Sequence, residues 1–266
     1  IHKAGLLLFL TALFLDRIAA ALERGSTRRW LLCGIVAGLL ALTQENMLML
    51  MVVIPAWILL RAGSSPTRGR AAGAFLVGMG ALLTFVAARN YSVGSVFALT
   101  TSNAGQNFFI GNHPGATGLY ESLSSGRQNP TQELEDATRL AEQAVGRTLT
   151  PAEVSSYWLR RGLEFASEQP TAWAKLLVRK VLLVWNRFEA PDADDLPTYA
   201  DWSGVLRIPA DLLHFGVLAP LGLAGWTLSR GRREPRELLG GLMIALTAAI
   251  ALFFVFGRYR LPLAAM

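Results

Sequence analysis

Two long segments of this chain contain no charged residue, and they restrict its fold more than any other feature. They run from Ala71 to Ala88 and from Leu238 to Phe256, and each is long enough for a helix that crosses the apolar core of a bilayer. Hydrophobic residues make up 52% of the chain and charged residues only 17%, against about 25% in soluble domains. We therefore predict an all-α polytopic membrane protein.

Further apolar segments bring the expected number of membrane passes to about six. One carries the adjacent pair Asp16 and Arg17, and another carries Asp211 and His214. The apolar stretch between residues 30 and 60 is interrupted by polar residues at 43–46, so it forms either two short passes or one long broken helix. The expected passes are Ala4–Leu22, Trp30–Leu42, Met47–Leu60, Ala71–Ala88, Ile208–Leu228 and Leu238–Phe256.

Three short loops between these segments are rich in arginine: residues 23–29, 61–70 and 229–237. Lysine and arginine are enriched in the cytoplasmic loops of membrane proteins. If residues 30–60 form two passes, all three arginine-rich loops lie on the same side of the membrane. We therefore favour two passes there. The predicted organisation is transmembrane helices over 1–88, an extracytoplasmic, mostly helical segment over 89–207, and transmembrane helices over 208–266.

The net charge of +6 does not indicate a nucleic-acid partner. Much of the basic excess lies in the arginine-rich loops, whereas residues 89–207 hold more acidic than basic side chains. We expect membrane lipids as partners and no nucleic acid.

The cysteine and histidine content limits the cofactors. One cysteine excludes an internal disulfide, and three scattered histidines argue against a metal site built from imidazoles. The acidic run Asp192–Asp195 matches a metal-binding Asp-x-Asp pattern only loosely. No cofactor is therefore identified, and a divalent metal ion is left open.

The extracytoplasmic segment is expected to contain three helices. Asn129 and Pro130 begin the first, and a capping box at Thr150–Glu153 begins the second. The third, from Thr171 to about Phe188, is amphipathic, with Lys180 assigned to its cationic face. This helix lies either at the membrane interface or against neighbouring helices.

Several short motifs follow one another along the chain: Gly38–Asn46, Arg89–Tyr91, Thr101–Phe108, Gly111–Pro114, Thr117–Tyr120, Tyr157–Trp158, Trp185–Glu189 and Gly257–Pro262. In their order and spacing they resemble bacterial membrane glycosyltransferases of the GT-C fold. That group includes the protein O-mannosyltransferases and the lipid A aminoarabinose transferase, and the resemblance covers nearly the whole chain. It implies transfer of a sugar from a polyprenyl-phosphate donor to a lipid, glycan or protein acceptor on the outer face of a membrane that we expect to be the bacterial inner membrane.

The resemblance also implies an acidic catalytic residue on the first outer loop of such an enzyme. We expect this residue upstream of Ile1, because the chain reads as a C-terminal-side fragment of a longer protein. Glu45, in the polar break of the 30–60 region, is a candidate within the chain. The alternative for Glu45 is a solvated turn.

A phosphate leaving group requires cations at the membrane surface, and arginine can hold two phosphate oxygens at once. The candidates for the donor phosphate are Arg89, Arg258 and Arg260. The candidates for the acceptor side are Asn112, Tyr120 and Glu189. The alternative for each arginine is anchoring at the membrane interface, with its charged head in water.

Two other functions are compatible with the sequence. A non-enzymatic membrane transporter or glycan-assembly partner would show charges or broken helices at mid-membrane in both halves. A lipid-linked-oligosaccharide ligase would use a similar donor but move a whole glycan.

Overall fold

The computed structural model describes residues 3–60, 66–94, 103–124, 130–190, 199, 201–212, 214–228 and 233–266. These residues are almost entirely helical, as predicted, and within them the only β-type pairing is an isolated bridge between Leu119 and Val255. The elements in chain order are α1 (Lys3–Arg24), α2 (Thr27–Thr43), η1 (Glu45–Met49), α3 (Leu50–Leu60), α4 (Pro66–Gly94), α5 (Ala104–Gly111), α6 (Pro130–Val145), α7 (Pro151–Glu168), α8 (Pro170–Val184), α10 (Gly204–Leu212), α11 (Phe215–Leu228), α12 (Arg233–Ala251), η2 (Gly257–Arg260) and α13 (Leu261–Ala265).

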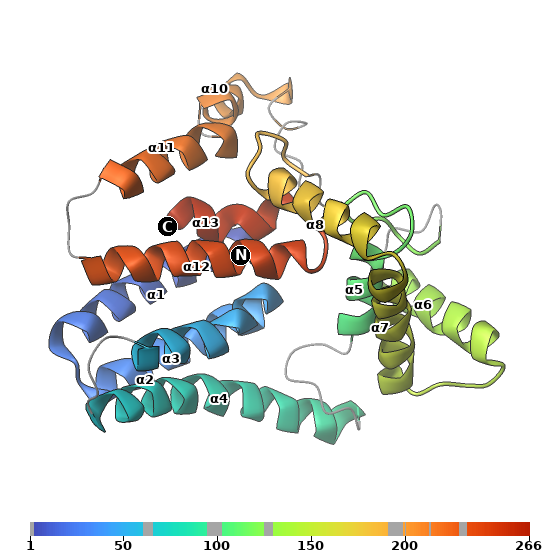
Figure 1. Ribbon diagram of the computed structural model, residues 1–266, viewed down its shortest axis with the longest axis horizontal. Coiled ribbons are helices and arrows are strands. Elements are labelled where there is room, and N and C mark those ends of the chain that lie inside the picture. Colours follow the sequence, from blue (N-terminus) through green and yellow to red (C-terminus); the bar gives the residue numbers. More distant parts are fainter. Residues whose placement is uncertain are drawn as a thin grey trace.

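The helices form a bundle with a lateral extension (Figure 1). The bundle contains α1–α4 and α11–α13, and α5–α7 lie beyond the end at which α12 stops, with α8 linking the two parts. The core of the bundle is a single apolar cluster that includes Phe14, Leu40, Phe75 and Leu246. A smaller cluster around Ala137, Ala141, Val154 and Trp158 joins α6 to α7.

The helix ends that carry arginines lie together at one end of the bundle. In Figure 1 the last turns of α1, α3 and α11 and the first turns of α2, α4 and α12 all lie at the left. The first turns of α2, α4 and α12 carry Arg28, Arg29, Arg68, Arg70, Arg233 and Arg236. We call this end of the bundle the arginine end, and the end at which α12 stops the opposite end.

Residues 30–60 form two helices rather than one broken helix. α2 ends at Thr43, Gln44 is extended, and η1 leads into α3, which runs back toward the arginine end (Figure 1). The polar residues 44–46 interrupt the apolar pattern, and the chain reverses there. The chain therefore reverses within this region, as the two-pass layout requires, but neither α2 nor α3 is long enough to count as a full-length pass.

The number of full-length membrane passes is smaller than expected. In the described part of the chain, two helical stretches are long and apolar enough to cross a bilayer, Lys3–Glu23 and Thr67–Val93, rather than about six. The polar break keeps α2 and α3 short, and α12 begins with charged residues and ends at Ala251 rather than Phe256. The expected pass over 208–228 is divided, because α10 ends at Leu212 and α11 begins at Phe215.

Glycines allow α2 and α4 to approach closely. A Cβ at Gly34 would lie 2.1 Å from the Phe75 carbonyl oxygen, and one at Gly78 would lie 2.3 Å from the Leu31 carbonyl oxygen. Small residues at such crossings bring two helix backbones into direct contact. This contact holds α4 directly against α2 within the bundle.

Replacing Gly78 by alanine is expected to lower the free energy of unfolding by about 1–3 kcal/mol, because the added Cβ must push the backbones apart. The matched control is Gly80→Ala on the same helix, where no atom lies within 4 Å of the added Cβ. Helix propensity alone makes that control neutral or slightly stabilising. Unfolding in mixed micelles measures both variants, and equal losses would show that close approach is not what Gly78 provides.

Candidate functional site

The extension meets the bundle where α12 ends. A turn at Leu252 and Phe253 follows α12, and beyond it the Val255 amide donates a hydrogen bond to the Gly118 carbonyl oxygen at 2.9 Å. This pairing places Leu119 beside Val255 and brings Tyr120 next to the segment that precedes η2. Residues more than a hundred positions apart therefore form one junction between the bundle and the extension.

Asn112 is the polar centre of this junction. Its side chain is fully buried, and its Nδ2 donates to the carbonyl oxygens of Phe108 and Leu252, each at 2.8 Å. Its Oδ1 accepts from Trp173 Nε1 at 2.9 Å and from Lys180 Nζ at 3.0 Å. Asn112 was predicted on the acceptor side, but the amide is engaged by protein groups and links α5, α8 and the end of α12.

Lys180 is buried, contrary to the prediction that it lies on the cationic face of its helix. Leu176, Lys180 and Val184 follow one another at four-residue spacing and form the buried face of α8. No carboxylate pairs with the ammonium group in the described residues, and burial lowers the pKa of Lys180 to about 7. The same spacing was visible in the sequence and could have placed this lysine correctly.

The stability of the protein is expected to rise with pH between about 7 and 10 because of Lys180. Its pKa is about 7 in the folded state against 10.5 for an ordinary lysine, so the unfolded chain binds more protons in this range. Below pH 7 both states carry the proton, and the contribution is constant. One such group changes the free energy of unfolding by at most about 1.4 kcal/mol per pH unit.

Lys180→Met provides the control for this pH dependence. It keeps the length of the side chain and removes the titrating group, so the slope between pH 7 and 10 should decrease relative to the unmodified protein. Unfolding in mixed micelles at a series of pH values gives the slope. An unchanged slope in Lys180→Met would assign it to other groups.

Arg260 is also buried, and it closes the end of α8. Its Nη1 donates to the Asn186 carbonyl oxygen at 2.9 Å and its Nη2 donates to the Phe188 carbonyl oxygen at 2.8 Å. The Nη1 also lies 3.4 Å from the carbonyl oxygens of the last two residues of α8. A cation at this position complements the negative end of the helix dipole.

Glu189 completes the surroundings of Arg260. One carboxylate oxygen of Glu189 lies 2.6 Å from Arg260 Nη2, and the Phe215 ring centre lies 4.9 Å from the guanidinium carbon. The predicted phosphate ligand Arg260 and the predicted acceptor-side residue Glu189 are thus brought together as an ion pair. The Arg260 guanidinium is directed at protein groups from α8, from the segment after it and from α11.

Tyr120, by contrast, joins a group of aromatic rings around Arg258. We call Tyr120, Phe254, Phe256 and Tyr259 the aromatic cluster. The Tyr120 ring lies 5.3 Å from those of Phe254 and Phe256, and the Arg258 guanidinium carbon lies 5.2 Å from the Phe256 ring centre and 5.6 Å from that of Tyr259. Burial, followed by a hydrogen bond to Glu133, raises the pKa of Tyr120, so its hydroxyl stays protonated at neutral pH. Phe254 is buried, whereas Arg258 and the rings of Tyr120, Phe256 and Tyr259 are only partly buried, unlike Arg260.

Arg89 and Glu45 lie on other elements. Arg89 is exposed near the end of α4, with its Nη1 3.4 Å from Asn90 Oδ1. Glu45 begins η1, is partly buried and lies at the reversal between α2 and α3, where η1 contacts α12. The predicted site residues therefore divide into three groups: the ion pair of buried Arg260 with partly exposed Glu189, the aromatic cluster with Arg258, and single residues elsewhere.

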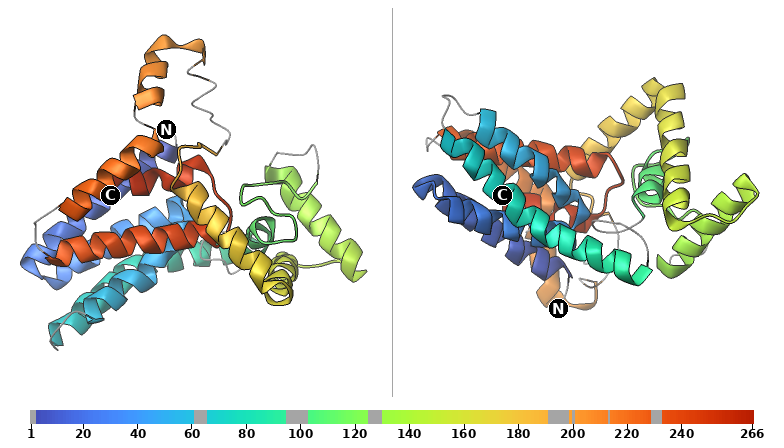
Figure 2. Two further views of the ribbon diagram at one scale, coloured as in Figure 1. Left: turned by 45° about the horizontal axis from the view of Figure 1, so that its top comes forward. Right: turned by 90° about the horizontal axis from the view of Figure 1, so that it is seen from below.

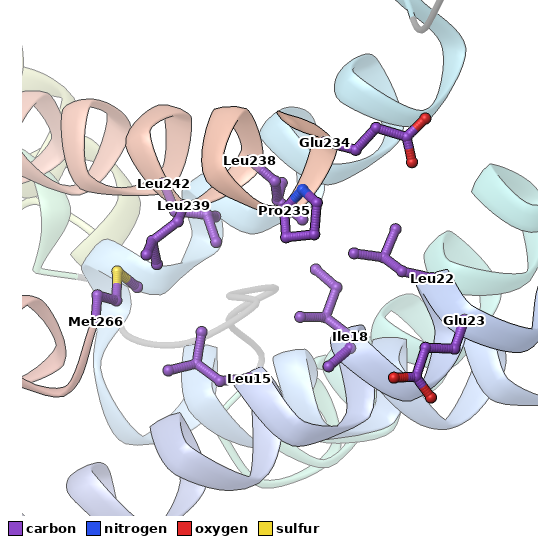
Figure 3. A pocket seen from close by; sticks show the side chains of 11 residues that line it. Leu15, Ile18, Leu22, Glu23, Glu234, Pro235, Leu238, Leu239, Leu242 and Met266 are labelled. Atoms are coloured by element: carbon purple, nitrogen blue, oxygen red, sulfur yellow. The ribbon is translucent and has the colours of Figure 1, made fainter. Parts of the chain in front are cut away.

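An apolar cavity lies away from this junction (Figure 3). It measures about 410 Å³ and is lined by α1, α12 and Met266, with Glu23 and Glu234 among leucine and isoleucine side chains. These glutamates belong to the last turn of α1 and the first turn of α12, so the cavity extends toward the arginine end. None of the predicted site residues lines it.

Among the described residues, no group of three or more histidine, cysteine, aspartate or glutamate side chains could hold a metal ion. The acidic run at 192–195 lies outside the described residues. Comparisons with protein-family profiles, curated proteins and solved structures found no match to this chain.

Proposed function

We propose that this chain belongs to a membrane glycosyltransferase that moves a sugar from a polyprenyl-phosphate donor to an acceptor on the extracytoplasmic face. The observation that carries the proposal is the position of Arg258. It lies among the aromatic rings where the extension meets the bundle, at the end opposite the arginine-bearing helix ends. A cation and stacking surfaces for a sugar phosphate are thus combined at one place.

The apolar surface of the bundle supports a location in the membrane. α1 and α4 are long enough to cross a bilayer, and large apolar side chains are exposed on the outward faces of several helices. Examples are Phe9, Val52, Val77, Phe85 and Ile244. With the arginine end in the cytoplasm, the aromatic cluster lies toward the outer surface, where a lipid-linked sugar would be used.

The chemistry assigns different tasks to the two arginines after α12. Arg258 would bind the phosphate that leaves when the sugar is transferred, since developing negative charge on phosphate oxygens is stabilised by a fixed cation. Arg260 holds the 257–260 segment against the end of α8 and so fixes the position of Arg258. The Tyr120 hydroxyl donates its hydrogen to Glu133, so toward the sugar it can accept a hydrogen bond, and its ring can stack. The resemblance to GT-C glycosyltransferases implies an acidic side chain as the group that takes the proton from the acceptor.

Replacing Arg258 by glutamine is expected to reduce sugar transfer about 10- to 100-fold, because the neutral amide cannot stabilise the leaving phosphate. Arg258→Lys should retain more activity, since the charge remains while the two-pronged geometry is lost. The complete protein is assayed in proteoliposomes with a radiolabelled polyprenyl-phosphate sugar, at equal amounts of folded protein.

The matched control is Arg161→Gln, an exposed arginine on α7 whose partner is Glu164. Its transfer rate should match that of the unmodified protein. Equal rates for Arg258→Gln and the unmodified protein would remove Arg258 from the donor site. Transfer of a whole oligosaccharide from a diphosphate-linked lipid, with no transfer of the single sugar, would identify a ligase instead.

A further inference from the structure

A short helix stands apart from the bundle. α10 is separated from α11 at residues 213–214, and the His214 carbonyl oxygen accepts the first hydrogen bonds of α11, from Val217 at 2.9 Å and Leu218 at 3.2 Å. Figures 1 and 2 show α10 projecting beyond the other helices. The segment expected to begin a membrane pass at Ile208 therefore forms a separate element.

One face of α10 is apolar and exposed. Val205, Ile208 and Leu212 recur at three- and four-residue spacing, with exposed fractions of 81%, 65% and 62%. Trp202 precedes the helix and is 88% exposed. Arg207 lies on another face of the same helix, because it is two residues from Val205 and one from Ile208. The helix is thus amphipathic, and most of the surface of Val205, Ile208 and Leu212 on its apolar face is exposed.

The length of α10 excludes a membrane pass. Its nine residues extend about 13 Å, less than half of the roughly 30 Å apolar core of a bilayer. An amphipathic helix of this size with a tryptophan beside it has the composition of a helix that lies flat at a membrane surface.

The position of α10 in the fold is consistent with a location at the membrane surface. α11 begins against the end of α8, since a Cβ at Gly216 would lie 2.8 Å from Arg187 Cβ, and Phe215 contacts Arg260. α10 therefore joins the bundle at the end opposite the arginine end, beside the junction. α11 itself exposes Leu221 and Leu223, so exposed apolar surface is found on both helices.

We infer that α10 lies in the headgroup region of the outer leaflet, with Val205, Ile208 and Leu212 inserted among the acyl chains and Arg207 directed toward phosphates and water. This inference rests on the proposed membrane location. The occupant of the apolar face is lipid rather than a second copy, because the next helix, α11, also exposes apolar side chains, and the exposed Trp202 is of a residue type enriched at membrane interfaces.

Single spin labels in proteoliposomes test the inference. Cys33 is the only cysteine, so Cys33→Ala gives a background for Val205→Cys, Ile208→Cys and Arg207→Cys. The matched depth control is Val77→Cys, an exposed position in the middle of α4. Relaxation by oxygen reports lipid, and relaxation by a water-soluble nickel complex reports water.

The labels at 205 and 208 should favour oxygen at a shallow depth, about 5–10 Å into the membrane, and the label at 207 should favour nickel. The label at 77 should lie deeper. If the labels at 205 and 208 are accessible to nickel while the label at 77 lies in lipid, the placement of α10 is overturned. The proposed membrane location of the bundle would then still stand. Nickel access at all four positions would overturn the membrane location itself. Spin–spin broadening at 205 would show a contact between two copies and would also overturn the lipid assignment.

Discussion

Replacing Arg260 by glutamine should lower the free energy of unfolding by about 2–4 kcal/mol, because it removes charge-assisted hydrogen bonds of a buried guanidinium, each worth about 1.5–3 kcal/mol. The guanidinium is only 2% exposed and donates to the carbonyl oxygens of Asn186 and Phe188. Loss of the charge leaves Glu189 without its cation and leaves the end of α8 without its cap. Few surface positions could produce a loss of this size.

Arg161→Gln is again the matched control, because Arg161 and Glu164 form an exposed pair 2.9 Å apart. Exposed pairs contribute about 0–1 kcal/mol, so this variant should unfold almost as the unmodified protein does. Reversible unfolding in mixed micelles gives both values. If the two variants lose the same amount, the buried contacts of Arg260 do not stabilise the junction as described.

Asn112→Leu is expected to cost about 3 kcal/mol or more, since it preserves the volume of the side chain but removes every hydrogen bond at the centre of the junction. Trp173 Nε1 and Lys180 Nζ lose their acceptor, and the Phe108 and Leu252 carbonyl oxygens lose a donor. Each buried group left without a partner costs about 1–3 kcal/mol. The loss should be largest where Lys180 carries its proton, below pH 7.

The double variant Asn112→Leu/Lys180→Met separates the two contributions. Removing the ammonium group that has lost its acceptor should recover part of the stability, so the double variant should unfold at a higher free energy than Asn112→Leu alone. Thermodynamic coupling between the two positions follows from the four unfolding free energies of the cycle. Additive losses would mean that Lys180 and Asn112 do not interact as their 3.0 Å contact indicates.

Local sequence signals predicted the secondary structure well where capping residues and apolar periodicity agree. The helix after Thr150 begins as its capping box requires: Thr150 Oγ1 accepts from the Glu153 amide, and Glu153 Oε2 accepts from the Thr150 amide. Gly146, with a φ of 77°, follows the last residue of α6 as expected for a helix stop. Both signals are contained within a few residues, so no tertiary contact is needed to recognise them.

The predicted boundaries of the membrane-crossing helices were less accurate. The pass expected over 208–228 is two helices, because a hydropathy pattern does not report where the backbone changes direction. The 30–60 region was correctly divided, because its polar residues interrupt the apolar pattern directly. Uniform hydrophobicity is therefore a weaker guide to helix boundaries than a polar interruption.

The sequence by itself determined the all-helical class, the scarcity of charge and the arginines that lie at one end of the bundle, because each depends on composition or on short-range pattern. Only the tertiary structure decided which charged side chains are buried and what they bind. Arg260 meets carbonyl groups about 75 positions earlier in the chain, and Lys180 meets an amide 68 positions earlier. A buried charge is tolerated only where several distant groups converge to satisfy it, and no local pattern encodes that convergence.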